Sequence, residues 1–184
     1  MPRNTRRISV RTATAVLALT FALMPALSGC AIGFDAATGQ QKDSGNGTTA
    51  DIGALQIRDL TIVMGPSGSN SATLIGTMVN TGTDADALTG VTIVSQADAK
   101  VAFTGPGVVD GALTLPAASA AKPAASSTRF GYNSDTHIDI TGLNVSPSAF
   151  VQVQLTFTVA GQPTPLSVMT VLPIGIYEGI APQA

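Results

Sequence analysis

The chain has 184 residues, of which 45% are hydrophobic and only 11% are charged, and this length suits one domain with a hydrophobic core. So low a charged fraction excludes a disordered acidic chain, a coiled coil and a charge-laced helical bundle. A single cysteine and a single histidine exclude an internal disulfide, a cysteine-based zinc site and a histidine-cluster metal site.

Residues 1–29 have the pattern of a bacterial secretory signal peptide. Four arginines within the first eleven residues form a basic region, and the apolar segment 13–27 follows it. This segment is too short for a membrane span and is interrupted by Pro25. The pair Arg6-Arg7 is also found in twin-arginine export signals, although the rest of that consensus is poor here.

The signal peptide ends in Leu27-Ser28-Gly29-Cys30, which resembles a lipobox: an aliphatic residue, two small residues and the only cysteine of the chain. In lipoproteins with this motif the thiol receives diacylglycerol, and cleavage then makes the cysteine the new N-terminus. We therefore predict lipidation at Cys30 and a protein held on the extracytoplasmic face of the cell membrane. The alternative is an ordinary buried cysteine after an ordinary cleavage site.

Residues 30–51 are predicted to be the lipidated cysteine and a flexible linker, because Gly, Ser, Thr, Asn and Gln dominate after Phe34. A chain that begins at Cys30 carries five basic and eleven acidic residues, a net charge of about −6. This acidic balance argues against a nucleic-acid partner and against electrostatic docking on anionic lipid. The acyl chains, and not charge, are expected to hold the protein on the membrane.

Residues 52–175 are predicted to form one all-β domain, an antiparallel β-sandwich, because short β-rich runs alternate with Gly, Pro, Asn and Asp turns. The alternation of apolar and polar residues changes phase at Arg58-Asp59, which indicates a β-bulge. In the clearest run, every second residue from Val151 to Val159 is apolar and shares one face. Residues 115–127 are predicted to be a surface loop, and residues 176–184 a C-terminal tail.

Several motifs of this domain resemble those of the periplasmic copper-chaperone domains called PCuAC. They are Asn80-Thr81-Gly82, the segment 86–91 with the pattern D-x-L-x-G, Leu115-Pro116-Ala117, the segment 137–143, and the closing run 153–161, VQLTFTVAG. With lipobox and linker, the whole chain is similar to actinobacterial envelope lipoproteins of the Lpq type. The resemblance covers residues 52–174 and implies a cupredoxin-like or immunoglobulin-like β-sandwich.

PCuAC domains carry Cu(I) on two histidines and two methionines, and only His137 matches a ligand of that set. Asp139 stands where the family has a methionine two residues later. The upstream ligands are expected near 101–104 and 108–109, which contain neither His nor Met. We therefore expect no copper as a cofactor. His137 is interpreted as an exposed strand histidine beside Asp139; the alternative is a weak His-x-Asp metal site or a pH-sensitive contact.

The mature chain's methionines, Met64, Met78 and Met169, all lie in apolar runs and are interpreted as core residues. No enzyme is predicted, because a nucleophile elbow, a facing pair of carboxylates and a phosphate loop are all missing from the sequence. Asp84 and Asp86 are interpreted as turn formers and not as calcium ligands.

The predicted function is therefore that of a non-catalytic binding or assembly module of a membrane-anchored lipoprotein, with a protein partner in the cell envelope. The alternative is a copper metallochaperone with a non-standard site around His137. No catalytic and no cofactor-binding residue is assigned.

Overall fold

The structure is a computed structural model, and it describes residues 47–118, 126–180 and 182. The predicted signal peptide, Cys30 and most of the predicted linker lie outside these residues, as does the middle of the predicted 115–127 loop. No helix in the described part of the chain is long and apolar enough to cross a membrane.

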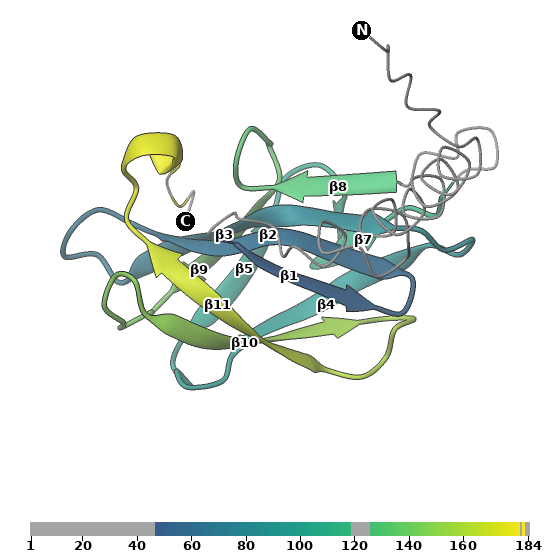
Figure 1. The fold of residues 1–184 in the computed structure, drawn as a ribbon, viewed down its shortest axis with the longest axis horizontal. Helices are drawn as coiled ribbons and strands as arrows, with labels where there is room; N and C mark the ends of the chain where they lie inside the picture. The colour runs from purple at the N-terminus through teal and green to yellow at the C-terminus, as the bar shows by residue number, and fades with distance from the viewer. Residues whose placement is uncertain (1–46, 119–125, 181, 183–184) are drawn as a thin grey trace, which may run out of the picture. The chain divides into compact units, whose positions relative to one another are not determined.

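The described residues form eleven strands and one short 3₁₀-helix, η1 (Gly175–Tyr177), which confirms the all-β prediction (Figure 1). The strands are β1 (Thr48–Ile52), β2 (Leu55–Met64), β3 (Ser71–Asn80), β4 (Asp86–Ile93), β5 (Lys100–Thr104), β6 (Val108–Val109), β7 (Ala112–Leu115), β8 (Ser126–Phe130), β9 (His137–Thr141), β10 (Phe150–Phe157) and β11 (Thr164–Val171).

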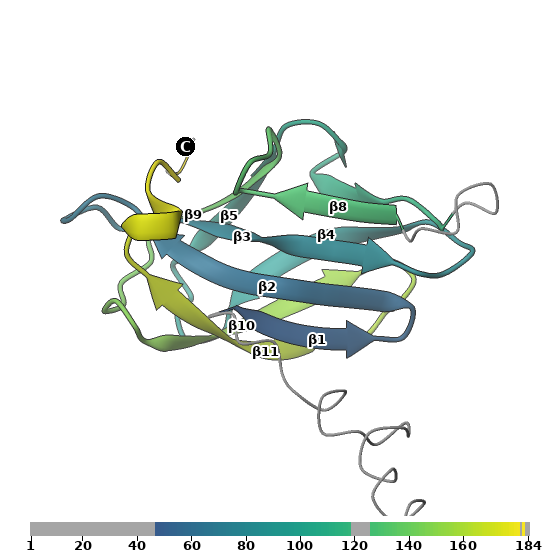
Figure 2. The same ribbon diagram turned by 45° about the horizontal axis from the view of Figure 1, so that its top comes forward.

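Two layers of strands face each other across the core. One layer contains β5, β9, β3 and β2, with β1 paired to β2 and β8 paired to β3. The other contains β11, β10, β4, β7 and β6. Strand β11 joins the layers, because Thr164–Met169 pairs with β10 and its last two residues pair with β2. The pairs are antiparallel with one exception, the parallel pair of β11 and β2. The result is a nearly closed sandwich (Figure 2).

The core lies between the layers and consists of aliphatic side chains with Phe130 and Phe157. In β10, Val151, Val153, Leu155 and Phe157 are all buried, as the alternation predicts. The prediction is wrong for Val159, which is exposed because β10 ends at Phe157.

The predicted bulge is confirmed in β2. The pairing register with β3 shifts between Arg58 and Thr61, and Asp59 has a φ of 55°. This left-handed conformation is uncommon for residues other than glycine, and aspartate tolerates it better than most. The bulge moves the apolar positions of β2 by one residue, so that Ile57 and Leu60 both reach the core.

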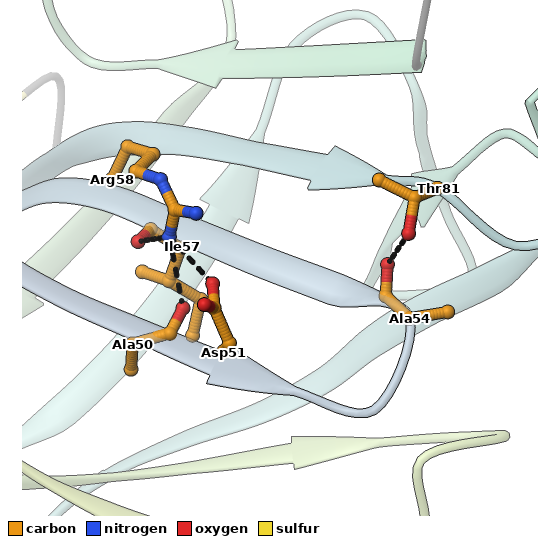
Figure 3. A network of polar contacts seen from close by, with 6 residues as sticks. All are labelled: Ala50, Asp51, Ala54, Ile57, Arg58 and Thr81. Atoms are coloured by element: carbon orange, nitrogen blue, oxygen red, sulfur yellow. Dashed lines mark hydrogen bonds and ion pairs between the residues drawn. The ribbon is translucent and has the colours of Figure 1, made fainter. Parts of the chain in front are cut away.

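Strand β1 begins at Thr48, so the ordered domain includes the last residues of the predicted linker. Arg58 of β2 fixes this strand: its guanidinium donates to the Ala50 carbonyl and forms an ion pair of 2.7 Å with Asp51 (Figure 3). The carbonyl of Ala54, in the β1–β2 turn, accepts hydrogen bonds from the backbone N–H and the hydroxyl of Thr81. Both side chains of the ion pair are partly exposed, so it contributes little to the stability of the domain.

The segment after β11 is also ordered, within the predicted C-terminal tail. Ile180 is buried, and with Tyr177 and Val171 it packs on Val63 and Ile75. These last two side chains lie on the outer face of the β9–β3–β2 layer, on the side away from the main core. The C-terminal segment therefore covers part of a sheet face that the sequence alone leaves exposed.

Candidate functional site

The first motif of the PCuAC resemblance has a structural role in this domain. The buried Asn80 side chain donates to the carbonyls of Asp84 and Leu115, and its oxygen accepts the N–H of Gly82. Asn80 therefore fastens the turn after β3 to the end of β7. All three polar contacts are used within the fold.

Asp86 has a similar role at the start of β4, as predicted for a turn former. Its Oδ1 accepts the backbone N–H of Ala87 at 2.7 Å and that of Val159 at 2.8 Å, and its Oδ2 accepts that of Ala160 at 3.1 Å. The carboxylate thus holds the end of β10 and the following turn against β4. The two motifs that open the resemblance stabilise turns and offer no free ligand.

The two candidate metal ligands, His137 and Asp139, lie on the outer face of β9, while Ile138 and Ile140 point into the core. The sequence predicts an exposed position for this pair. Instead, His137 is half-buried and Asp139 is buried, with 1% of its surface exposed. Asp139 accepts a hydrogen bond of 2.7 Å from the buried hydroxyl of Thr73 on β3. A buried carboxylate engaged in this way is poorly placed to bind an ion from solvent.

His137 keeps one unused polar atom. Its Nδ1 is buried and has no hydrogen-bond partner among the described residues. Register places Thr104 of β5 directly opposite His137, and Ala102 opposite Asp139. The fold therefore brings segment 101–104 beside His137, as the resemblance implies, but the side chains on that face are a hydroxyl and a methyl group.

The methionines lie away from His137. Met78 is buried in the core, and Met64 lies in register with the core residue Ala72, so both belong to the opposite face of the sheet. Met169 shares the face of His137. The pairings of β9, β3, β2 and β11 place it three strand spacings away, about 14 Å, with Ile75 and Thr61 between them. A thioether–copper–imidazole site needs ligands within a few ångströms of one ion.

Larger groups of metal-binding side chains are also missing from the part of the chain that the structure describes: no three His, Cys, Asp or Glu side chains come together there. One imidazole nitrogen without an adjacent thioether does not fit the soft ligand set that Cu(I) requires. Cys30, the predicted lipidation site, lies outside the described residues.

The sequence motifs do not indicate one further feature of the described domain. Four large apolar side chains, Phe150, Leu172, Ile174 and Ile176, are exposed in β10, after β11 and in η1. The available signal is the stretch of 38 residues from Ile140 to Tyr177, which contains no charged residue. The apolar residues of this stretch follow the alternation expected of strands. The pattern therefore does not show which of them stay exposed and which reach the core.

Solved structures of PCuAC domains resemble this domain. The copper-bound PCuAC domain from PmoF2 is 20% identical, with a TM-score of 0.55 over 68% of this chain and 99% of its own. The apo PCuAC domain from PmoF1 is 14% identical, with a TM-score of 0.56 over 68% of this chain and 100% of its own. No protein-family model matches the sequence, and neither does any curated protein. At these identities the likeness concerns the fold alone, and the described domain has the fold of the PCuAC copper-chaperone domains.

Proposed function

We propose that the protein is a lipoprotein of the Lpq type, anchored through Cys30 on the extracytoplasmic face of the cell membrane. Its domain is a non-catalytic binding or assembly module for an envelope partner, and it does not carry copper in the manner of PCuAC domains. The observation that supports this most is the row of outer-face residues that runs across the sheet from Thr104 and His137 to Met169. Within this row the imidazole of His137 lies on β9 and the thioether of Met169 on β11, too far apart to bind one ion.

A second candidate is copper transport at a non-standard site around His137. The unpartnered Nδ1 of His137 favours it, because a free imidazole nitrogen is a ligand for Cu(II) as well as Cu(I). A single nitrogen would give weak binding, and the experiment below separates the two functions.

The copper experiment is an anaerobic titration of the mature chain with Cu(I) against a competing chelator, followed by Cu(II). We expect no saturable binding of Cu(I) at nanomolar concentration. Thr104→Met should tighten Cu(I) binding by about tenfold or more, since it places a thioether one cross-strand pair from His137. The matched control is Thr92→Met, on the exposed face of the other layer, which should have no effect. Tight Cu(I) binding by the unmodified chain, abolished in His137→Ala, would instead establish the metallochaperone.

The anchor is tested by Cys30→Ser. Because the thiol is the only group in this motif that can form the thioether to diacylglycerol, the variant should leave the membrane fraction and lose the mass of the lipid. Fractionation followed by mass spectrometry of the N-terminal peptide measures both. A processed Cys30→Ser chain that stays in the membrane fraction would contradict lipid anchoring.

A further inference from the structure

One end of the sandwich gathers four of the exposed large apolar side chains. The turn after β2, the segment between β9 and β10 and the segment after β11 all lie there, as strand register requires and as Figures 1 and 2 show. We call Phe150, Leu172, Ile174 and Ile176 the apolar tip. Phe150 is 69% exposed, Ile174 67% and Ile176 73%. Isolated exposed aliphatic side chains are common, but four at one end of a small domain indicate an interaction surface.

This end of the sandwich also has few charged residues. The segments 61–73, 141–151 and 168–177, which supply most of it, contain no Asp, Glu, Lys or Arg. The charged residues nearest the tip are Asp98 in the β4–β5 turn, Lys100 at the start of β5, and Glu178 after η1. The opposite end carries Asp51 and Asp84 in or beside its turns. A surface of large apolar side chains with so few charged groups suits the apolar boundary of a bilayer, where burying a charge is costly.

The chain enters the domain in its half nearer the tip. Strand β1 begins at Thr48, which pairs with Leu60, and it runs toward the β1–β2 turn at the opposite end of the sandwich. The chain therefore enters β1 on the side nearer the tip. Thr48 lies four residues of β2 from Met64, about 13 Å. Seventeen residues separate Cys30 from Thr48 in the sequence, and a linker of that length with the predicted flexible composition has an expected span of about 20–25 Å. With Cys30 lipidated as proposed, a linker of this length would limit how far the domain moves from the bilayer and would raise the effective concentration of the tip there.

We propose that the apolar tip inserts into the interface of the bilayer that holds the lipid anchor. The domain then rests on the membrane with its tip, and its opposite end faces away. This inference rests on the proposed lipid anchor at Cys30. Each apolar side chain that leaves water adds to the membrane affinity. Because the anchor raises the effective concentration of the tip at the bilayer, even a weak intrinsic affinity is enough for insertion.

The test uses the lipidated full chain in phosphatidylcholine vesicles, with one environment-sensitive fluorophore on an introduced thiol. Because the Cys30 thiol is occupied by lipid, Ile176→Cys and Val159→Cys each offer one reactive thiol. Val159 is the matched control, because it is 64% exposed but lies in the turn after β10, at the opposite end. With spin-labelled lipid, we expect quenching at residue 176 and none at residue 159. Adding Ile174→Asp should abolish the quenching at 176, whereas adding Thr92→Asp should not.

Two results separate the inference from the anchor. Vesicle flotation of the Ile174→Asp chain, whose tip is disabled, reports on the anchor, and a chain that does not float overturns the anchor and the tip inference with it. A chain that floats but shows equal quenching at the two positions overturns the tip inference only. Protection of residue 176 by a second copy or by another protein, without quenching by lipid, would also overturn it.

Discussion

Phe157→Ala should unfold a large fraction of the domain or lower its midpoint of denaturation sharply. The ring is 3% exposed, closes the core at the end of β10 and lies opposite Leu88. Removing a buried phenylalanine side chain costs about 3–5 kcal/mol, while a whole domain is stable by about 5–15 kcal/mol. Urea denaturation followed by far-ultraviolet circular dichroism measures the change.

The control for this substitution is Phe150→Ala, in the same strand and of the same chemistry. Its ring is 69% exposed, so its free energy of unfolding should change by less than about 0.5 kcal/mol. A large effect at residue 150 with a small one at residue 157 would mean that the two faces of β10 are exchanged.

Asp86→Ala should destabilise the domain by about 3 kcal/mol, because three backbone N–H groups lose their charged acceptor together. Asp86→Asn keeps one acceptor oxygen, so its free energy of unfolding should lie between those of the unmodified protein and Asp86→Ala. Hydrogen exchange should accelerate first at the amides of Val159 and Ala160. The matched control is Asp84→Ala, whose carboxylate is exposed and lies 3.5 Å from the Thr83 hydroxyl. Equal loss in the two alanine variants would contradict the role of Asp86 as a clamp.

The alternation of apolar and polar residues predicts the strands well, because the side chains on the buried face of a strand are apolar. The inward face of β10 and the bulge at Arg58-Asp59 both follow from it. The resemblance similarly places segment 101–104 beside His137, and the register confirms the placement.

The environment of the candidate site could not be predicted in the same way. The burial of Asp139 depends on Thr73, sixty-six residues away, and local alternation assigns this face of β9 to solvent. The segment around Ile180 covers Val63 and Ile75, which are far from it in the sequence. Nothing in the local sequence of these residues indicates this contact. The separation of His137 from Met169 follows only from the order of four strands, which periodicity does not give.

The parallel pairing of β11 with β2 has a consequence for the speed of folding. Ile62 and Thr170 are 108 residues apart in the chain, yet their contact joins the two layers. Contacts between such distant segments carry a large loop-closure entropy and form late, so sandwiches of this kind fold in milliseconds to seconds. Until β11 has docked, the end of β2 keeps an unpaired edge that can pair with other chains. In a chain that emerges from its N-terminus, this edge therefore stays uncovered until residues 170 and 171 have followed.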